Sequence, residues 1–65
     1  MENNIKAIRQ KLDMSQAKFA NYMEIPLPNI QKWEAGRTNP PEYVYNLILR
    51  ILKNDYPDID FKEGL

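Results

Sequence analysis

The stretch from Ser15 to Gly36, SQAKFANYMEIPLPNIQKWEAG, holds two short helical patterns separated by a break that contains two prolines. Pro26 has no backbone N–H, and Pro28 disfavours the helical conformation at Leu27, so a helix that begins after Ser15 must end by about residue 25. Proline is well tolerated in the first turn of a helix. A second helix is therefore predicted here, with Leu27 as its N-cap and Pro28 as its first residue.

Apolar residues at helical spacing predict two further helices, one on each side of this stretch. Ile5, Ile8 and Leu12 mark the first helix, and residues 13–14 interrupt it. After a loop, Pro41 is suited to open the last helix. The residues expected to form the buried stripe of that helix are Val44, Leu47, Ile48, Ile51 and Leu52, with Tyr43, Tyr45 and Leu49 beside or opposite it.

Within the central stretch, Ser15 is suited to cap the first helix, and Gly36 is suited to end the second in a left-handed conformation. The apolar faces are expected at Ala17, Phe19, Ala20 and Met23 in the first of these helices, and at Ile30 and Trp33 in the second. Two short helices joined by a tight turn meet the requirements of a helix-turn-helix. The sequence thus predicts an all-α fold, a small four-helix domain with a central helix-turn-helix and a short acidic C-terminal tail.

The composition excludes several classes of function. The 65 residues make at most one domain, and they include neither cysteine nor histidine. A disulfide framework, a thiolate nucleophile and the commonest metal ligand and general base are therefore absent, so we expect no enzyme activity, no metal site and no cofactor. No apolar run approaches the roughly 20 residues that span a bilayer, which predicts a cytoplasmic protein without membrane contact.

The formal net charge is zero, but the charges are unevenly distributed. Residues 1–53 contain eight basic and five acidic side chains, a net charge of +3, whereas residues 54–65 contain one basic and four acidic side chains, a net charge of −3. The sequence therefore predicts a mildly basic helix-turn-helix domain over residues 1–53 and an acidic C-terminal tail over residues 54–65.

An ordered set of residues resembles the phage repressor and Cro-type (XRE-like) helix-turn-helix DNA-binding proteins. It consists of S-Q-A-x-F-A at residues 15–20, Ile25 in the turn, Ile30, and W-E-x-G-x-x-x-P at residues 33–40. The resemblance covers roughly Ile5 to Lys53. It implies a small transcriptional regulator, repressor-like in fold, that binds double-stranded DNA in a sequence-specific way with its third helix in the major groove.

The resemblance also implies roles for individual residues. The residues that would contact base edges are Leu27, Pro28, Asn29 and Lys32. The residues that would contact the DNA backbone are Ser15 and Gln16 at the start of the second helix and Arg37, Thr38 and Asn39 in the loop after the third. Arg9 and Glu34 would form an ion pair between the first helix and the end of the third.

Several positions depart from the family pattern. Glu24 stands where the family usually has glycine, which predicts either a turn built from a non-glycine residue with some strain or a slightly reshaped turn. Leu27 and Pro28 stand where hydrogen-bonding side chains are common; they suit thymine methyl groups, whereas Asn29 and Lys32 suit adenine and guanine edges. An apolar reading surface and a zero net charge leave an alternative open, a protein-interaction adaptor or antitoxin-like partner on the same fold.

We expect the protein to act as a homodimer. The resemblance implies pairing of two copies with their recognition helices roughly 34 Å apart, one turn of duplex. The last predicted helix carries more apolar residues than one face of a small bundle buries. The tail residues Tyr56, Ile59 and Phe61 could cover that surplus in their own chain or in a partner, and the sequence leaves both arrangements open.

Overall fold

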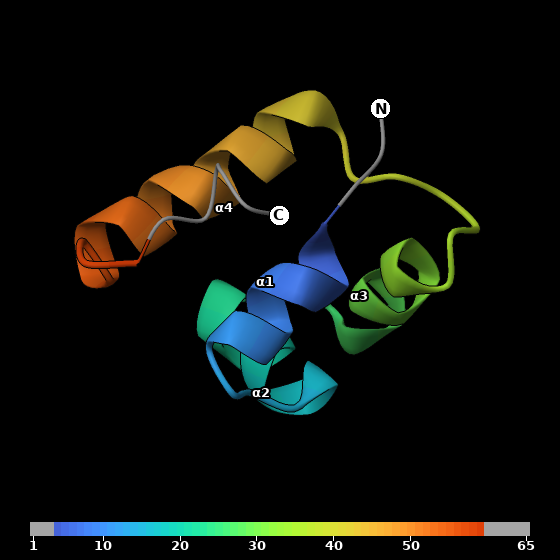
Figure 1. Cartoon of the computed structure of the whole chain (residues 1–65). Helices are drawn as coiled ribbons and strands as arrows, with labels where there is room; N and C mark the ends of the chain where they lie inside the picture. Colours follow the sequence, from blue (N-terminus) through green and yellow to red (C-terminus); the bar gives the residue numbers. More distant parts are fainter. Residues whose placement is uncertain (1–3, 60–65) are drawn as a thin grey trace.

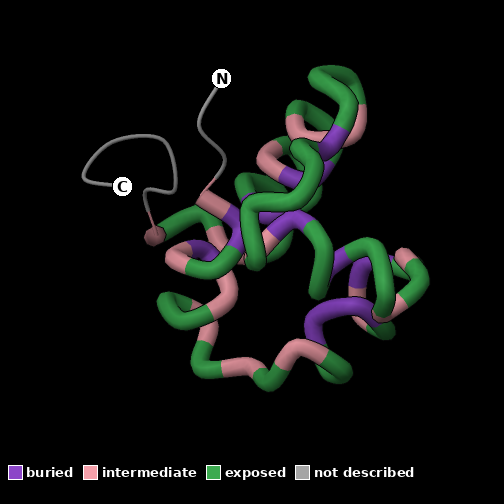
Figure 2. Tube along the Cα trace, turned by 90° about the vertical axis from the view of Figure 1, so that its right-hand side faces the viewer, coloured by how far each residue is buried: buried purple, intermediate pink, exposed green. Residues whose placement is uncertain are grey.

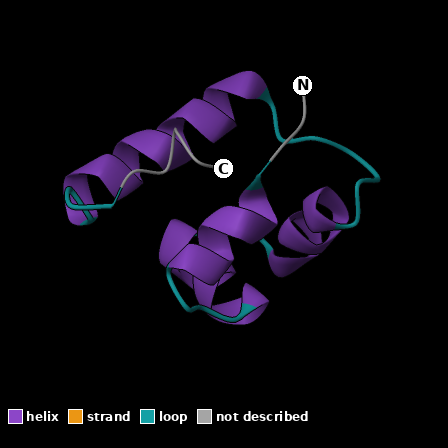
Figure 3. Ribbon diagram, viewed as in Figure 1, coloured by secondary structure: helices purple, strands orange, loops and turns teal. Residues whose placement is uncertain are grey.

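The computed structural model describes residues 4–59 and contains four α-helices and no strand within that range (Figures 1 and 3). The helices are α1 (Ile5–Lys11), α2 (Gln16–Met23), α3 (Leu27–Glu34) and α4 (Glu42–Asp55). α2 and α3 pack against each other, and α3 also packs against α1. The long α4 runs above α1 in the view of Figure 1, and its C-terminal end contacts α2. The predicted all-α fold is confirmed, and no helix of the described residues is long and apolar enough to cross a membrane.

The core is apolar, and among residues 4–59 no polar or charged residue is buried as a whole. All four helices contribute to it, as the buried segments of Figure 2 show. The buried residues are Ile5, Ile8, Phe19, Ala20, Met23, Ile30, Trp33, Ile48 and Leu52. Ala17, expected on the same face as Phe19, is exposed instead. Pro40 is also buried and anchors the loop between α3 and α4.

The predicted buried stripe of α4 is wrong at two positions. Ile48 and Leu52 are buried, but Leu47 and Ile51 are 44% and 40% exposed. Tyr43, at 69% exposure, lies one turn before Leu47, so these three side chains share one outward face. Val44, predicted in the buried stripe, is half-buried against the core. Tyr45 and Leu49, predicted beside or opposite the stripe, are also half-buried and pack against the core. We call the exposed set Tyr43, Leu47 and Ile51 the α4 stripe.

α1, α2 and α3 end in the same way, with a left-handed residue directly after the last turn. Asp13 and Glu24 both have φ +57°, and Gly36 has φ +78°. After α2, the amide of Ile25 donates to the carbonyl of Ala20 at 2.9 Å and the amide of Glu24 donates three residues back, which is the Schellman pattern. The expected left-handed exit at Gly36 and the strained turn at Glu24 are both confirmed.

The corner between α2 and α3 differs from the prediction by one residue. Pro26, with φ −56° and ψ 134°, is the N-cap of α3, so Leu27 is the first helical residue and Pro28 the second. An extended proline needs no N–H at a cap, and Pro28 keeps the helical φ that its ring imposes. At the start of α2, the predicted cap is present: the Ser15 Oγ accepts from the Lys18 amide at 3.0 Å.

The end of α4 is joined to α2 by an aromatic and carboxylate contact. The Tyr22 hydroxyl donates to Asp55, and the rings of Tyr22 and Tyr56 meet edge-on with centroids 6.3 Å apart. Burial, together with the bond to Asp55, raises the pKa of Tyr22. Tyr56 and Ile59 pack against the core of their own chain, whereas Phe61 lies outside the described residues.

Replacing Glu24 with glycine should stabilise the protein by about 1 kcal/mol, because glycine adopts a left-handed conformation without the clash of Cβ. For a chain of this size, that is a rise of about 4–8 °C in the midpoint of thermal unfolding. Gly36→Ala is the matched control: a Cβ there would meet no atom within 4 Å, so any loss of stability reports backbone strain alone. A Glu24→Gly variant less stable than the native chain would contradict this account.

Candidate nucleic-acid interface

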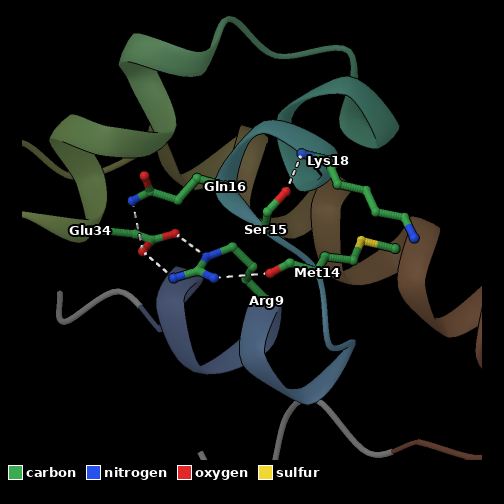
Figure 4. Close-up of polar contacts among 6 residues, drawn as sticks. All are labelled: Arg9, Met14, Ser15, Gln16, Lys18 and Glu34. Atoms are coloured by element: carbon green, nitrogen blue, oxygen red, sulfur yellow. Dashed lines mark hydrogen bonds and ion pairs between the residues drawn. The ribbon is translucent and has the colours of Figure 1, made fainter.

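Arg9 and Glu34 form the ion pair that the sequence predicts, and the pair is bidentate (Figure 4). The Arg9 Nε donates to the Glu34 Oε2 at 2.8 Å, and the Arg9 Nη2 donates to the Glu34 Oε1 at 2.9 Å. The two side chains are 15% and 5% exposed. The contact joins the middle of α1 to the last residue of α3.

Arg9 also holds the turn between α1 and α2. Its Nη1 donates to the carbonyl of Met14 at 2.9 Å, and its own carbonyl accepts from the Met14 amide at 3.2 Å. Met14 directly precedes Ser15, the cap of α2. A single guanidinium therefore fixes the start of α2 relative to both α1 and α3.

Gln16, the first residue of α2, completes this network. Its Nε2 donates to the Glu34 Oε1 at 3.2 Å. A side-chain amide nitrogen carries two hydrogens, so one remains for a second acceptor. The Lys18 and Phe19 amides bond to Ser15. The amides of the first helical positions, Gln16 and Ala17, point out of the helix end, where an anion is favoured.

The charges of the network are matched. Burial opposes ionisation of Glu34, but hydrogen bonds from Arg9 and Gln16 and the positive charges of Arg9 and Lys6 outweigh it and hold the pKa of Glu34 below its usual range. The hydrogen bond to Glu34 in turn raises the pKa of Arg9. Both groups are ionised at neutral pH, and the pair adds no net charge to the surface around it.

The outer face of α3 is exposed. Pro28, Gln31 and Lys32 follow the i, i+3, i+4 spacing of one helix face, and Asn29 lies on its flank; all four are exposed. Leu27 is half-buried and packs partly against the core. Three of the four predicted base-contacting residues, Pro28, Asn29 and Lys32, are thus presented together on α3.

The predicted backbone-contacting residues fall into two groups, one at the start of α2, where Gln16 is bonded to Glu34, and one in the loop that follows Glu34. Ser15 and Gln16 lie at the start of α2, and the exposed loop residues Arg37, Thr38 and Asn39 begin three residues after Glu34, the last residue of α3. Lys6 and Asn39 border an open pocket of about 420 Å³ between α1 and the end of α3. Lys6 thereby adds a cation beside the loop.

Sequence reasoning missed two residues of this surface. Gln31 lies three residues after Pro28, and helical spacing alone could have placed it on the same face. The position of Lys6 near Glu34 depends on how α1 packs against α3, for which the sequence contains no local signal.

Two short helices at a tight corner, with the second exposed along its outer face and followed by a loop with one exposed cation, Arg37, define a small helix-turn-helix domain of the DNA-binding class. The family description "Helix-turn-helix" matches residues 5–59, so the chain belongs to this XRE-type family. Domains of the family bind double-stranded DNA, and the chain is a DNA-binding helix-turn-helix regulator. Comparison with curated proteins and with solved structures gave no match.

Removing Arg9 should destabilise the protein strongly, because the Glu34 carboxylate, 5% exposed, would lose its counter-charge. We expect Arg9→Met to cost about 3 kcal/mol in urea unfolding at pH 7. Glu34→Gln should cost less, since the glutamine oxygen still accepts from Arg9. The variant with both Arg9→Met and Glu34→Gln completes a double-mutant cycle, which gives the interaction energy between the two side chains.

The same variants predict a pH dependence. Because folding lowers the pKa of Glu34, the stabilisation is fully present above the unfolded value, about 4.3, and is lost as the pH falls through the lowered folded value. The native chain should therefore lose more stability than Glu34→Gln between about pH 5 and the acid end of the titration. If the unfolding free energies of the native chain and of Glu34→Gln fell equally with decreasing pH, the lowered pKa of Glu34 would be refuted as the source of the pH dependence.

Proposed function

We propose that the protein is a transcriptional regulator that binds double-stranded DNA sequence-specifically, with α3 in the major groove. A helix about 10–12 Å in diameter fits a groove about 12 Å wide. The base-contacting residues are Pro28, Asn29 and Lys32, with a partial contribution from Leu27. The backbone contacts come from Ser15, Gln16, Arg37, Thr38 and Asn39.

One observation carries this proposal: the outer face of α3 is exposed between two groups that are suited to phosphate and held by one ion pair. The α2 end offers the outward amides of Gln16 and Ala17, and the loop after α3 offers the exposed guanidinium of Arg37. Because Glu34 is bonded to both Arg9 and Gln16, the spacing between these groups is set by the fold. Contacts of this kind position a protein on a duplex, and side chains between them read the bases.

Substitutions should separate the two kinds of contact. Lys32→Ala and Asn29→Ala should relax sequence preference, with a loss of about 1–3 kcal/mol on the preferred duplex. Arg37→Ala should weaken all duplexes about equally and reduce the slope of log K against log salt by about one. Lys53→Ala, which removes an exposed cation in the last turn of α4, is the control and should change neither quantity. Unchanged DNA affinity in the three test variants would remove the DNA-reading proposal.

The homodimer expected from the sequence has one observation in its favour: the α4 stripe, which the monomer leaves exposed. We assign this stripe to a second copy of the chain. Two α4 helices packed antiparallel about a two-fold axis near Leu47 bring Tyr43 of one copy against Ile51 of the other.

Sedimentation of the full chain in the micromolar range should show a monomer–dimer equilibrium. Leu47→Gln with Ile51→Gln should shift it to the monomer, because the contact then buries polar amides. Lys18→Gln, an exposed change on α2, is the control and should leave it in place. A full-length protein that is monomeric at every concentration would end the dimer proposal. If that monomer also bound no duplex, the adaptor function would replace DNA binding.

A further inference from the structure

The first turn of α3 has few hydrogen-bonding groups. Pro26, its N-cap, makes no side-chain cap bond, and Leu27 and Pro28 carry hydrocarbon side chains. Pro28 has no N–H, and the amide of Asn29 is used internally, donating to the Pro26 carbonyl at 3.0 Å. This end of α3 is therefore poorly equipped to hold a phosphate or to read a base edge through polar groups at positions 27 and 28.

The apolar part of this turn is nevertheless directed outward. Pro28 is exposed, and on the same face Gln31 and Lys32 follow at three and four residues. Leu27 is half-buried and packs against the core, so it is less accessible than Pro28. The start of α3 thus exposes a rigid hydrocarbon ring at Pro28.

The major groove has one apolar feature that a hydrocarbon ring can recognise, the 5-methyl group of thymine. Adenine, guanine and cytosine present donors and acceptors there, and a proline ring satisfies none of them. Gln31 is suited to the N6 and N7 of adenine, and Lys32 to the O6 and N7 of guanine. This face of α3 therefore combines a ring suited to a methyl group, at Pro28, with polar side chains suited to base edges about one turn further along, at Gln31 and Lys32.

We propose that Pro28 is a specificity-determining residue that recognises a pyrimidine 5-methyl group in the DNA site. This inference rests on the proposed DNA-binding function and specifies its ligand. A ring that makes no hydrogen bond cannot distinguish the O4 of thymine from the N4 amino group of cytosine. At this position, thymine and 5-methylcytosine should bind alike, and uracil and unmethylated cytosine should both bind more weakly.

The test begins with duplexes selected from a random pool by the full chain. Each thymine of the selected duplex is replaced in turn by uracil, 5-methylcytosine or cytosine, with the matching partner base, and affinity is measured by fluorescence anisotropy. At one position per half-site, uracil and cytosine should weaken binding about fourfold, the value of one buried methyl group. 5-Methylcytosine should bind within about twofold of thymine at that position.

Variants of the protein assign the effect to Pro28. Pro28→Ser replaces the ring with a short polar side chain that suits the first turn of a helix, and it should bring the thymine-to-uracil affinity ratio at that position close to one. Pro57→Ser, at an exposed turn after α4, is the matched control and should leave the ratio at about fourfold. An effect of the methyl group on DNA shape alone would survive in Pro28→Ser and would overturn the assignment.

The remaining outcomes separate this inference from the function on which it rests. If the chain binds its selected duplex but thymine and uracil bind alike at every position, methyl recognition is wrong and DNA binding stands. If no duplex is bound even at low salt, the proposed function fails, and methyl recognition fails with it.

Discussion

The ion pair between Arg9 and Glu34 is the constraint on which the arrangement of the domain depends. Helices of seven or eight residues are too short to be stable alone, so α1, α2 and α3 persist only through their contacts with each other. Apolar contacts supply most of that stability but tolerate rotation and sliding. Arg9 uses three of its nitrogens, and Glu34 uses both oxygens, in directional bonds to three segments of chain. A pair with side chains only 15% and 5% exposed gains little net energy once desolvation is counted, so we infer that its main effect is to select one register of these helices.

Helix ends and caps that depend on the geometry of a single residue could be predicted from the sequence. Proline chemistry located the corner within one residue, because the missing N–H of Pro26 and the fixed φ of Pro28 act regardless of tertiary structure. Ser15 and Gly36 likewise act through their own backbone and side-chain geometry. The Arg9–Glu34 pair came from the family resemblance and not from any local rule. The bond from Gln16 to Glu34 could not be predicted, since it depends on the crossing of α2 and α3.

The face that α4 buries could not be predicted either, for a different reason. Its apolar residues surround most of the helix, so two overlapping faces fit the same period. The packing that α4 makes with the other helices selects the face containing Ile48 and Leu52, and the contact of Asp55 with Tyr22 fixes its rotation at the C-terminal end. Leu47 and Ile51 are left outside by that rotation. A stripe excluded from the core is as informative as a buried one, because it is hydrophobic surface that the monomer does not use.

The modest charge of the chain bears on how such a protein would achieve specificity. Neutralisation of phosphates supplies nearly all non-specific affinity, and each neutralised phosphate contributes to the salt dependence. Residues 1–53 have a net charge of only +3, and residues 54–65 offset it with −3. Non-specific binding should therefore be weak, and discrimination must come from contacts that differ between sequences. In the proposed complex, the exposed ring of Pro28 and the polar side chains of Gln31 and Lys32 would make contacts of that kind, because their energy would change with the base they meet.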